Sequence, residues 1–237
     1  MPDEEAREGA APEAVRFEAE LERLYAARFP TQEREEKARL WRTLCDAFFS
    51  RYVPEDGCVV DLGAGYCDFV NHIRARRRIA VDVNPDARRF AAEGVEVLSL
   101  PIERIGEALE PGSVDLVFAS NVFEHMRSPE ALLQVLRGVR VVLRPGGRLV
   151  VMQPNVRLLG GAFWNFFDHT LPLTEMGMAE ALKVVGLDVV ECRGRFMPYT
   201  TKSRLPKWDF LVRLYLKLPP AQFVFGKQML VIAERRR

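Results

Sequence analysis

The sequence is poor in the residues that build disulfide frameworks and structural metal sites. It contains four cysteines and three histidines in 237 residues. The cysteines form no CxxC pair, and no histidine accompanies them at metal-ligand spacing. We therefore expect no metal site, and free thiols of the kind kept in a reducing cytoplasm.

Long apolar runs are also missing. The first 14 residues, MPDEEAREGAAPEA, are acidic and contain none of the apolar stretch that marks a signal peptide. No apolar run approaches the roughly 18 residues that a membrane-spanning helix needs. The expectation is a cytoplasmic protein, with peripheral membrane contact left open by the basic C-terminal segment described below.

The chain as a whole has no large excess of positive or negative charge, but its two ends do. Lys and Arg number 34 against 33 Asp and Glu, a net charge of +1. Such a balance argues against a dedicated nucleic-acid-binding protein. However, residues 1–36 hold 11 acidic and 5 basic residues, whereas residues 186–237 hold 11 basic and 4 acidic ones. An acidic front and a basic end therefore flank a balanced centre.

The centre alternates short apolar runs with helical patterns. The runs lie at 58–62, 79–82, 95–98, 114–119, 148–152, 188–193 and 228–233. Helices are predicted at 68–76, 85–93, 129–143 and 174–185. This alternation predicts an α/β fold with a doubly wound, mostly parallel sheet of seven strands. Because the runs are continuously apolar, both faces of the sheet should be covered.

The chain is predicted to have two parts. Residues 1–54 are expected to form an acidic tail and two cover helices, at 13–28 and 32–52. Residues 55–237 are expected to form the main domain.

Ligands of an open parallel sheet bind at the carboxyl ends of its strands. The first run ends at Asp61, followed by Gly63 and Gly65, and the second run ends at Asp82. Glycines permit close approach of the backbone to a ligand, and a carboxylate after the second strand can accept both hydroxyls of a ribose. A dinucleotide site would need a third glycine where Asp68 stands, and that carboxylate would repel a pyrophosphate. These residues therefore favour a ligand with a cationic end over a dinucleotide. A nicotinamide-dependent oxidoreductase is the weaker alternative.

Four sequence motifs resemble those of one family and occur in the same order. VVDLGAGYC (59–67), AVDVNP (80–85), FASNVFEHM (118–126) and LRPGGRLVV (143–151) resemble the class I S-adenosylmethionine-dependent methyltransferases over roughly residues 55–192. The segment 167–182 is similar to the small-molecule branch, which includes ubiquinone-pathway O-methyltransferases. The resemblance implies S-adenosylmethionine as cofactor and methyl transfer to a small-molecule acceptor.

The resemblance also implies roles for the first glycine loop. Asp61, Gly63, Ala64 and Gly65 would line the methionine part of the cofactor. The family's third glycine is replaced here by Cys67, a small residue that fits in its place.

Three further segments would complete the cofactor site by the same resemblance. Asp82 would hold the ribose, and Val83 would flank the adenine. Leu100 and Ile102 would contact the adenine where the family often has an acidic residue. Asn121 would lie near the methyl end.

A hydroxyl acceptor benefits from a general base, and histidine suits that role near neutral pH. His169, in the irregular stretch 155–173 after the fifth strand, is the first candidate, with Asp168 beside it. His125, in an acid–histidine pair after the fourth strand, is the second. O-methylation of a sugar or natural-product hydroxyl is the expected reaction. N-methylation of an amino sugar or amine, and a catalytically silent cofactor-binding regulator, are the alternatives.

The stretch 155–173 is also expected to cover the acceptor. It carries four aromatic side chains, Phe163, Trp164, Phe166 and Phe167. They either form a lid over the acceptor or fill the core beneath the loop.

A second expected cover segment, 197–226, contains the apolar stretch LPKWDFLVRLYLKL at 205–218. Asp209, Arg213 and Lys217 give this helix one narrow polar stripe, so we expect it to be buried on most sides. Three partners are compatible with it: its own domain, a second subunit in a homodimer, or an anionic membrane surface met by residues 202–218.

Overall fold

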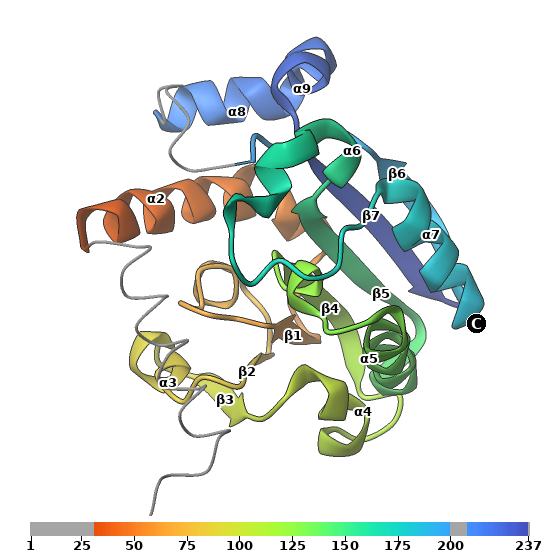
Figure 1. Cartoon of the computed structure of the whole chain (residues 1–237). Coiled ribbons are helices and arrows are strands. Elements are labelled where there is room, and N and C mark those ends of the chain that lie inside the picture. Colours follow the sequence, from red (N-terminus) through yellow and green to blue (C-terminus); the bar gives the residue numbers. More distant parts are fainter. Residues whose placement is uncertain (1–30, 200–207, 237) are drawn as a thin grey trace, which may run out of the picture. The chain divides into compact units, whose positions relative to one another are not determined.

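The computed structural model describes residues 31–199 and 208–236 (Figure 1). The chain divides into two compact units, Met1–Glu36 and Lys37–Arg237. The architecture given below is that of the second unit. The helix predicted at 13–28 lies outside the described residues.

Seven strands form one sheet in the order β3-β2-β1-β4-β5-β7-β6. The pairs β3–β2, β2–β1, β1–β4 and β4–β5 are parallel, whereas β7 runs antiparallel to both of its neighbours. The strands are β1 (Cys58–Leu62), β2 (Arg77–Asp82), β3 (Val95–Ser99), β4 (Val114–Ser120), β5 (Leu143–Pro154), β6 (Leu187–Arg193) and β7 (Gln228–Arg235). The predicted α/β fold with a doubly wound, mostly parallel seven-stranded sheet is thereby confirmed.

Helices cover both faces of this sheet (Figure 1). They are α2 (Thr31–Ala47), α3 (Ala87–Phe90), α4 (Ile105–Ala108), α5 (Pro129–Val142), α6 (Val156–Leu159), α7 (Glu175–Val184), α8 (Asp209–Lys217) and α9 (Pro219–Phe225). Side chains of α4, α5 and α7 share one apolar core with one face of the sheet. Residues 41–45 of α2 and two residues of α8 share a second core with the other face. Continuous burial of strands such as β1 follows from this double cover.

The longest helix on the first face shows why the sequence pattern succeeds there. The Ser128 Oγ accepts a hydrogen bond from the Ala131 N–H at 3.2 Å, and Pro129 occupies the first turn. Five apolar side chains at helical spacing then face the core: Leu132, Val135, Leu136, Val139 and Val142. The helix predicted at 129–143 is confirmed, ending one residue earlier.

The helices predicted at 68–76 and 85–93 are wrong in extent. The first is only a 3₁₀ turn, η2 (Val70–His72), and the second is reduced to α3. The Asn71 side chain donates to the Phe90 carbonyl and accepts from the Ala92 N–H, both at 2.8 Å. These side-chain hydrogen bonds join the two segments and replace helical ones.

The C-terminal helix pair corrects another expectation. Val212 and Leu216 of α8 are buried in the core, as predicted. Phe210, Leu214 and Leu218, which repeat every four residues, form a second apolar line that is exposed. One side of α8 suffices to close the core, and α9 does not cover the other, so the prediction of burial on most sides is wrong.

Close packing of α4 on α5 generates a stability prediction. A Cβ added to Gly138 would lie 3.0 Å from the backbone nitrogen of Gly106. Gly138→Ala should lower the free energy of unfolding by about 1–3 kcal/mol through overpacking, despite the better helix propensity of alanine. The matched control is Gly177→Ala in α7, where the nearest atom would be 3.6 Å away. Denaturant unfolding should show opposite signs for the two variants, and a Gly138→Ala protein as stable as the control would refute the close contact.

Candidate functional site

The candidate site lies where the strand order reverses. From β1 the chain proceeds to β2 and β3 on one side, and from β4 it proceeds to β5 on the other. The loops that follow β1 and β4 therefore start side by side and diverge, and the point of divergence is where open α/β sheets bind their ligands. They are packed tightly at their base, since a Cβ on Gly63 would lie 2.4 Å from Val122 Cγ2.

The loop after β1 has the backbone that its glycines allow. Gly63 and Gly65 have φ values of 72° and 52°. No described atom lies within 4 Å of the position of a Cβ on Gly65, so the space above it is open. Cys67 also adopts a left-handed conformation, with φ of 59°, and its buried Sγ lies 3.6 Å from the Ala87 carbonyl oxygen. A cysteine thus occupies backbone that favours glycine, as expected for a residue in the place of the third glycine.

The carboxylate of Asp61 is buried at the base of this loop. Its Oδ2 accepts a hydrogen bond from the Val70 N–H at 3.3 Å. Burial raises the pKa of Asp61 from 3.8 to about 8, and the nearby carboxylates of Asp68 and Asp82 add to the shift. A buried carboxylate of this kind has an unmet demand for positive charge.

Asp82, at the end of β2, faces the same loop. Its two oxygens accept hydrogen bonds from the N–H groups of Gly65 at 2.7 Å and Asn84 at 2.8 Å. Burial raises the pKa of Asp82, although these two hydrogen bonds oppose the shift. A carboxylate has about four acceptor positions, so these two backbone donors do not use its full capacity.

The residues predicted to flank an adenine differ in the solvent exposure of their side chains. Val83 is 47% exposed, and Leu100 is half-buried. Ile102 begins the 3₁₀ turn η3 (Ile102–Arg104), and its side chain is 7% exposed in the core. Leu100 therefore offers more side-chain surface to a ligand than Ile102 does.

Asn121 stands at the turn after β4. It has a φ of 51°, and its N–H donates to the Met152 carbonyl at 3.0 Å. Asparagine tolerates this left-handed backbone better than most residues do. Its exposed amide is thereby held at the start of the second loop.

Lys37 is a site residue that sequence reasoning missed. Its Nζ lies 3.2 Å from the Asp68 carboxylate and 5.5 Å from the centre of the Tyr66 ring. The helix α2 therefore contributes a cation beside the glycine loop. No motif surrounds Lys37 in the sequence, so only the fold could reveal this pair.

The acid–histidine groups of three segments meet beside the loop after β4. His125 belongs to the 3₁₀ turn η4 (Phe123–His125), and its Nδ1 lies 3.3 Å from Asp168 Oδ2 and 3.0 Å from the Asp168 carbonyl oxygen. The His169 ring stands 5.1 Å from the His125 ring, edge to face. Asp168 therefore orients His125 and not its sequence neighbour.

Glu124 brings a second carboxylate to this cluster. Its side chain is buried, and Oε2 has no hydrogen-bond partner among the described residues. Burial raises the pKa of Glu124 to about 7, against the opposing charge of His125. The cluster therefore contains a carboxyl group that can change its protonation state near neutral pH.

The same cluster has ligand types suited to a metal ion, which the sequence analysis did not expect. One atom each from Glu124, His125 and His169 can be chosen so that all lie within 4.8 Å of one another. Two imidazoles and a carboxylate suit a divalent transition metal. The group could thus serve proton transfer or hold a cation.

Aromatic rings surround His169. The rings of Phe163 and Phe166 lie 4.7 Å and 4.9 Å from it, with Phe166 stacked at 24°. Phe163 is buried, whereas Trp164 and Phe167 are exposed. The aromatic stretch is therefore divided, with part of it filling the core and part of it facing solvent beside the site.

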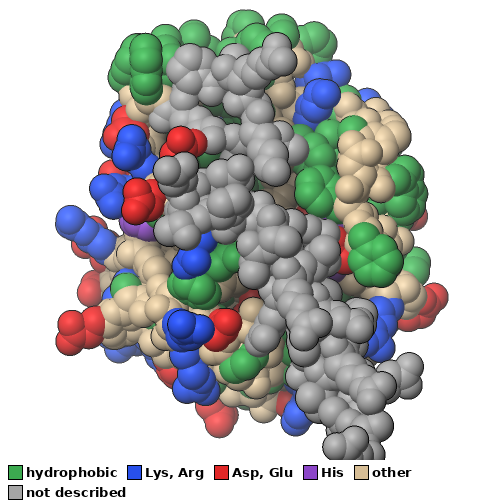
Figure 2. Space-filling model, turned by 60° about the vertical axis from the view of Figure 1, so that its left-hand side comes forward, with side chains coloured by type: hydrophobic (Ala, Val, Ile, Leu, Met, Phe, Trp, Pro, Cys, Tyr) green, Lys and Arg blue, Asp and Glu red, His purple; other side chains and the backbone are tan. Residues whose placement is uncertain are grey.

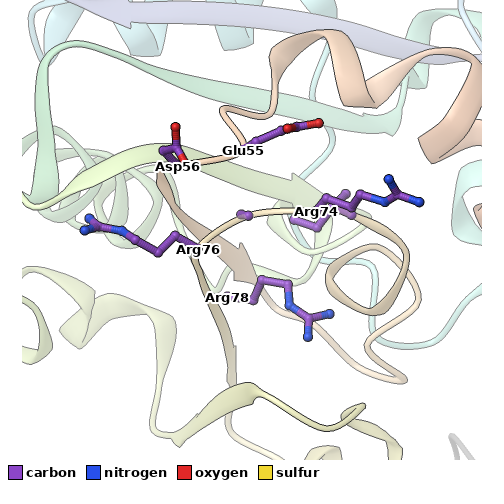
Figure 3. Close-up of a pocket in the computed structure, with 7 residues that line it drawn as sticks. Glu55, Asp56, Arg74, Arg76 and Arg78 are labelled. Atoms are coloured by element: carbon purple, nitrogen blue, oxygen red, sulfur yellow. The ribbon is translucent and has the colours of Figure 1, made fainter.

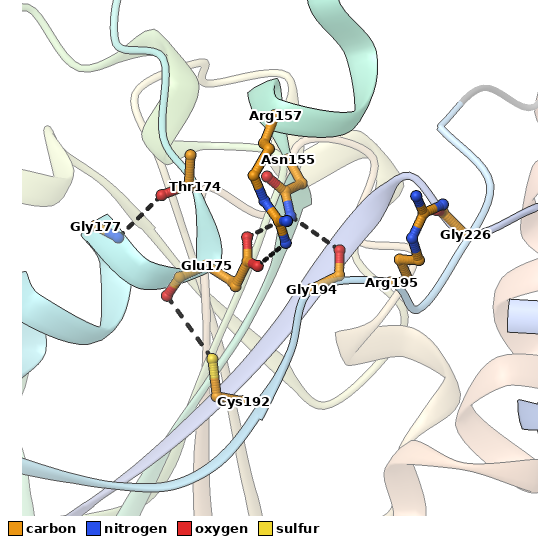
Figure 4. Close-up of polar contacts among 9 residues, drawn as sticks. All are labelled: Asn155, Arg157, Thr174, Glu175, Gly177, Cys192, Gly194, Arg195 and Gly226. Carbon is orange, nitrogen blue, oxygen red and sulfur yellow. Dashed lines mark hydrogen bonds and ion pairs between the residues drawn. The ribbon is translucent and has the colours of Figure 1, made fainter. Parts of the chain in front are cut away.

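A polar network anchors the start of that stretch (Figure 4). The Asn155 side chain donates to Glu175 at 2.6 Å and to the Gly194 carbonyl at 2.9 Å, and Arg157 pairs with the same carboxylate. Burial alone would raise the pKa of Glu175, but these donors lower it below its usual value. The network ties the segment after β5 to α7 and to the end of β6.

Gln153 is another residue that sequence reasoning missed. It lies near the carboxyl end of β5 and is buried, and neither atom of its amide has a hydrogen-bond partner among the described residues. Its signal in the sequence is a polar residue closing the apolar run RLVVM. A buried amide with unmet hydrogen bonds at this edge is a candidate contact for a polar ligand.

A separate hollow of about 580 Å³ lies at the opposite edge of the sheet, before β1 and β2. It is lined by Glu55, Asp56, Ile73, Arg74, Ala75, Arg76 and Arg78. Its labelled side chains diverge and do not converge on one point (Figure 3). The hollow therefore lacks the convergent polar groups found at the carboxyl edge.

Comparison with known proteins identifies the domain. Residues 60–149 match the family described as "Methyltransferase domain". A ubiquinone biosynthesis O-methyltransferase of Cupriavidus pinatubonensis is 32% identical over 111 residues, which cover 41% of this chain and 43% of that protein. Methyltransferase AacuQ of Aspergillus aculeatus is 33% identical over 115 residues, covering 43% and 36%. The chain thus spans less than half the length of these relatives.

Solved structures agree in fold. A SAM-dependent methyltransferase of Archaeoglobus fulgidus superposes with a TM-score of 0.64 at 22% identity, covering 90% of this chain and 98% of that one. A possible histamine N-methyltransferase of Thermotoga maritima gives 0.59 at 16% identity, covering 93% and 97%. Residues 60–149 thus match a methyltransferase domain, and the seven-stranded sheet around them has the fold of S-adenosylmethionine-dependent methyltransferases.

Proposed function

We propose that the protein transfers a methyl group from S-adenosylmethionine to a hydroxyl of a sugar or other natural product. The observation that carries the proposal is the acid–histidine cluster beside the loop after β4, at the same sheet edge as the glycine loop. The O-methyltransferase among the relatives supports a hydroxyl acceptor.

The cofactor would supply a methyl group already activated on a sulfonium. Asp61, with its unmet demand for positive charge, suits the cationic end of the cofactor, and Asp82 suits the ribose hydroxyls. The open backbone above Gly65 allows close approach. Asn121 and the exposed side of Val83 would complete the two ends of the site. What remains for the protein is to align the acceptor and to remove its proton.

His125 is the better supported base of the two candidates. Its Nδ1 faces Asp168, so its other ring nitrogen is free of that carboxylate. The imidazole is partly exposed, whereas that of His169 is 7% exposed and packed against Phe163 and Phe166. We propose that His125 accepts the proton, that Asp168 orients it, and that His169 shapes the pocket wall.

Asp82→Asn tests the cofactor site. The amide keeps the shape but loses the charge that strengthens hydrogen bonds from hydroxyl groups, so the dissociation constant for S-adenosylmethionine should rise about tenfold or more. Calorimetric titration measures it, with Asp86→Asn in the same loop as the control. An unchanged dissociation constant in the Asp82 variant would remove the ribose role.

Asp61→Asn should separate stability from binding. Between pH 3.8 and about 8 the folded protein retains a proton on Asp61 that the unfolded chain has released, so Asp61 reduces stability as pH rises through that range. The variant cannot ionise, so without cofactor its Tm should exceed that of the wild type at pH 8.5 and match it near pH 4. Its cofactor affinity should fall. Equal Tm values at pH 8.5 would show that the carboxylate is not buried as described.

His125→Gln and His169→Gln test the assignment of the base. The first should lower kcat about a hundredfold or more with cofactor affinity unchanged, because a positioned base contributes about that factor. The second should lower it less. His72→Gln, in the 3₁₀ turn η2 that follows the glycine loop, is the control. A larger loss in His169→Gln would reverse the assignment, and turnover lost to a chelator and restored by a divalent metal would assign the cluster to metal binding instead.

The alternatives give other results in the same assays. An N-methyltransferase would turn over amine acceptors and would retain activity in His125→Gln. A catalytically silent regulator would bind S-adenosylmethionine without turnover in a broad acceptor screen.

A further inference from the structure

We propose that the exposed face of α8 and α9 docks on an anionic lipid surface. Seven large apolar side chains form this α8–α9 surface: Trp208, Phe210, Leu214, Leu218, Phe223, Val224 and Phe225. Their exposed fractions run from 42% to 70%. Figure 2 shows hydrophobic side chains gathered along the edge that α8 and α9 occupy in Figure 1, with cationic side chains beside them. A patch of this size on a folded domain indicates an interaction site.

The α8–α9 surface is held in place before any partner arrives. The Tyr215 hydroxyl donates to the Phe196 carbonyl at 2.6 Å, which fixes α8 to the segment after β6. The buried Gln222 amide donates to the Leu216 carbonyl at 3.0 Å, which ties α9 to the end of α8. Trp208 and Phe210 stack at 5.9 Å. The apolar rings therefore stay exposed because the core beneath them is already closed.

Charge around the surface favours an anionic partner. The described residues 208–227 contain three cationic residues, Arg213, Lys217 and Lys227, and one acidic residue, Asp209. Lys217 and Lys227 are exposed, and the Arg195 guanidinium lies 5.0 Å from the centre of the Phe223 ring. Aromatic side chains with adjacent Lys and Arg are the composition that binds at the headgroup level of anionic bilayers.

A second copy of the chain fits this surface less well. A two-fold symmetric interface places the same patch on both partners. It would bring the exposed Lys217 and Lys227 of both copies to one interface, with Asp209 as the one acidic residue of 208–227 to offset them. A bilayer satisfies the apolar and the cationic residues together. No helix in the described part of the chain is long and apolar enough to cross a membrane, so the contact would be peripheral.

The position of the surface connects it with the acceptor. In the antiparallel pair, Pro154 at the carboxyl end of β5 stands opposite Gln228, which follows α9 after Gly226 and Lys227. The Asn155 N–H donates to the Lys227 carbonyl at 3.0 Å. The segment that carries the α8–α9 surface therefore returns to the sheet at the same edge as the cofactor loops. Resting on the proposed function, this placement suits a hydroxyl acceptor carried on a lipid or a long alkyl chain.

Co-sedimentation of the full chain with vesicles tests the docking. Wild type should bind vesicles containing phosphatidylglycerol at low salt, and phosphatidylcholine vesicles much less. The triple variant Phe210→Ser, Leu214→Ser, Phe223→Ser should lower partitioning about tenfold or more. Lys217→Gln with Lys227→Gln should also lower it about tenfold, and added salt should have the same effect.

The control replaces equally exposed apolar residues elsewhere, Met176→Ser with Val184→Ser on α7, which are 73% and 64% exposed. It should bind vesicles as wild type does. No binding of wild type to anionic vesicles, or equal binding of the triple variant, would overturn the proposal. So would a wild-type dimer in light scattering that the triple variant converts to monomer, since a second copy would then occupy the surface. Titration with S-adenosylmethionine is independent of vesicles, so failure of the docking leaves the proposed methyl transfer standing.

Discussion

The parallel pairing of β1 with β4 is the constraint on which the site depends. Residues of β1 from Val59 to Leu62 stand beside residues of β4 from Leu116 to Ala119, so both strands end at one level. Their loops must then diverge, because the chain continues to opposite sides of the sheet. Gly63 permits the loops to touch at their base. The place of the site at this edge is therefore a consequence of connectivity.

Several features that lower the free energy of unfolding in the absence of a ligand lie together at the site. Asp61 is buried and its pKa is raised despite the opposing charge of Lys37, and Cys67 holds a backbone conformation that favours glycine. Each is unfavourable by itself. They occur together at one sheet edge, and the parallel strands, whose cores are continuous on both faces, supply the rigidity that holds them. Clustering of such costs at one edge is the pattern of a functional site.

Sequence patterns predicted the helices and strands that are specified by their own apolar periodicity. They failed where contacts between distant segments determine the local structure. The apolar runs gave all seven strands, and the pattern of α5 gave its length nearly to the residue. The segment 68–76 is helical in composition, but Asn71 bonds to a segment some 20 residues away. In the site, spacing could bring Asp61 and Asp82 together, because both end adjacent parallel strands. It could not pair Asp168 with His125, 43 residues earlier.

The antiparallel direction of β7 determines where the basic C-terminal segment meets the sheet. Because β7 runs antiparallel to β5, the residues just before β7 lie at the carboxyl edge of the parallel strands. The helices α8 and α9 are inserted there, and Val212 and Leu216 of α8 pack in the core on one face of the sheet. Under the proposed function, the cofactor side of the site would be built from the segments after β1, β2 and β4. The acceptor side would be built from the segments that follow β5 and β6. The proposed binding of the acceptor and the proposed docking on a lipid surface would then take place at the same carboxyl edge of the sheet.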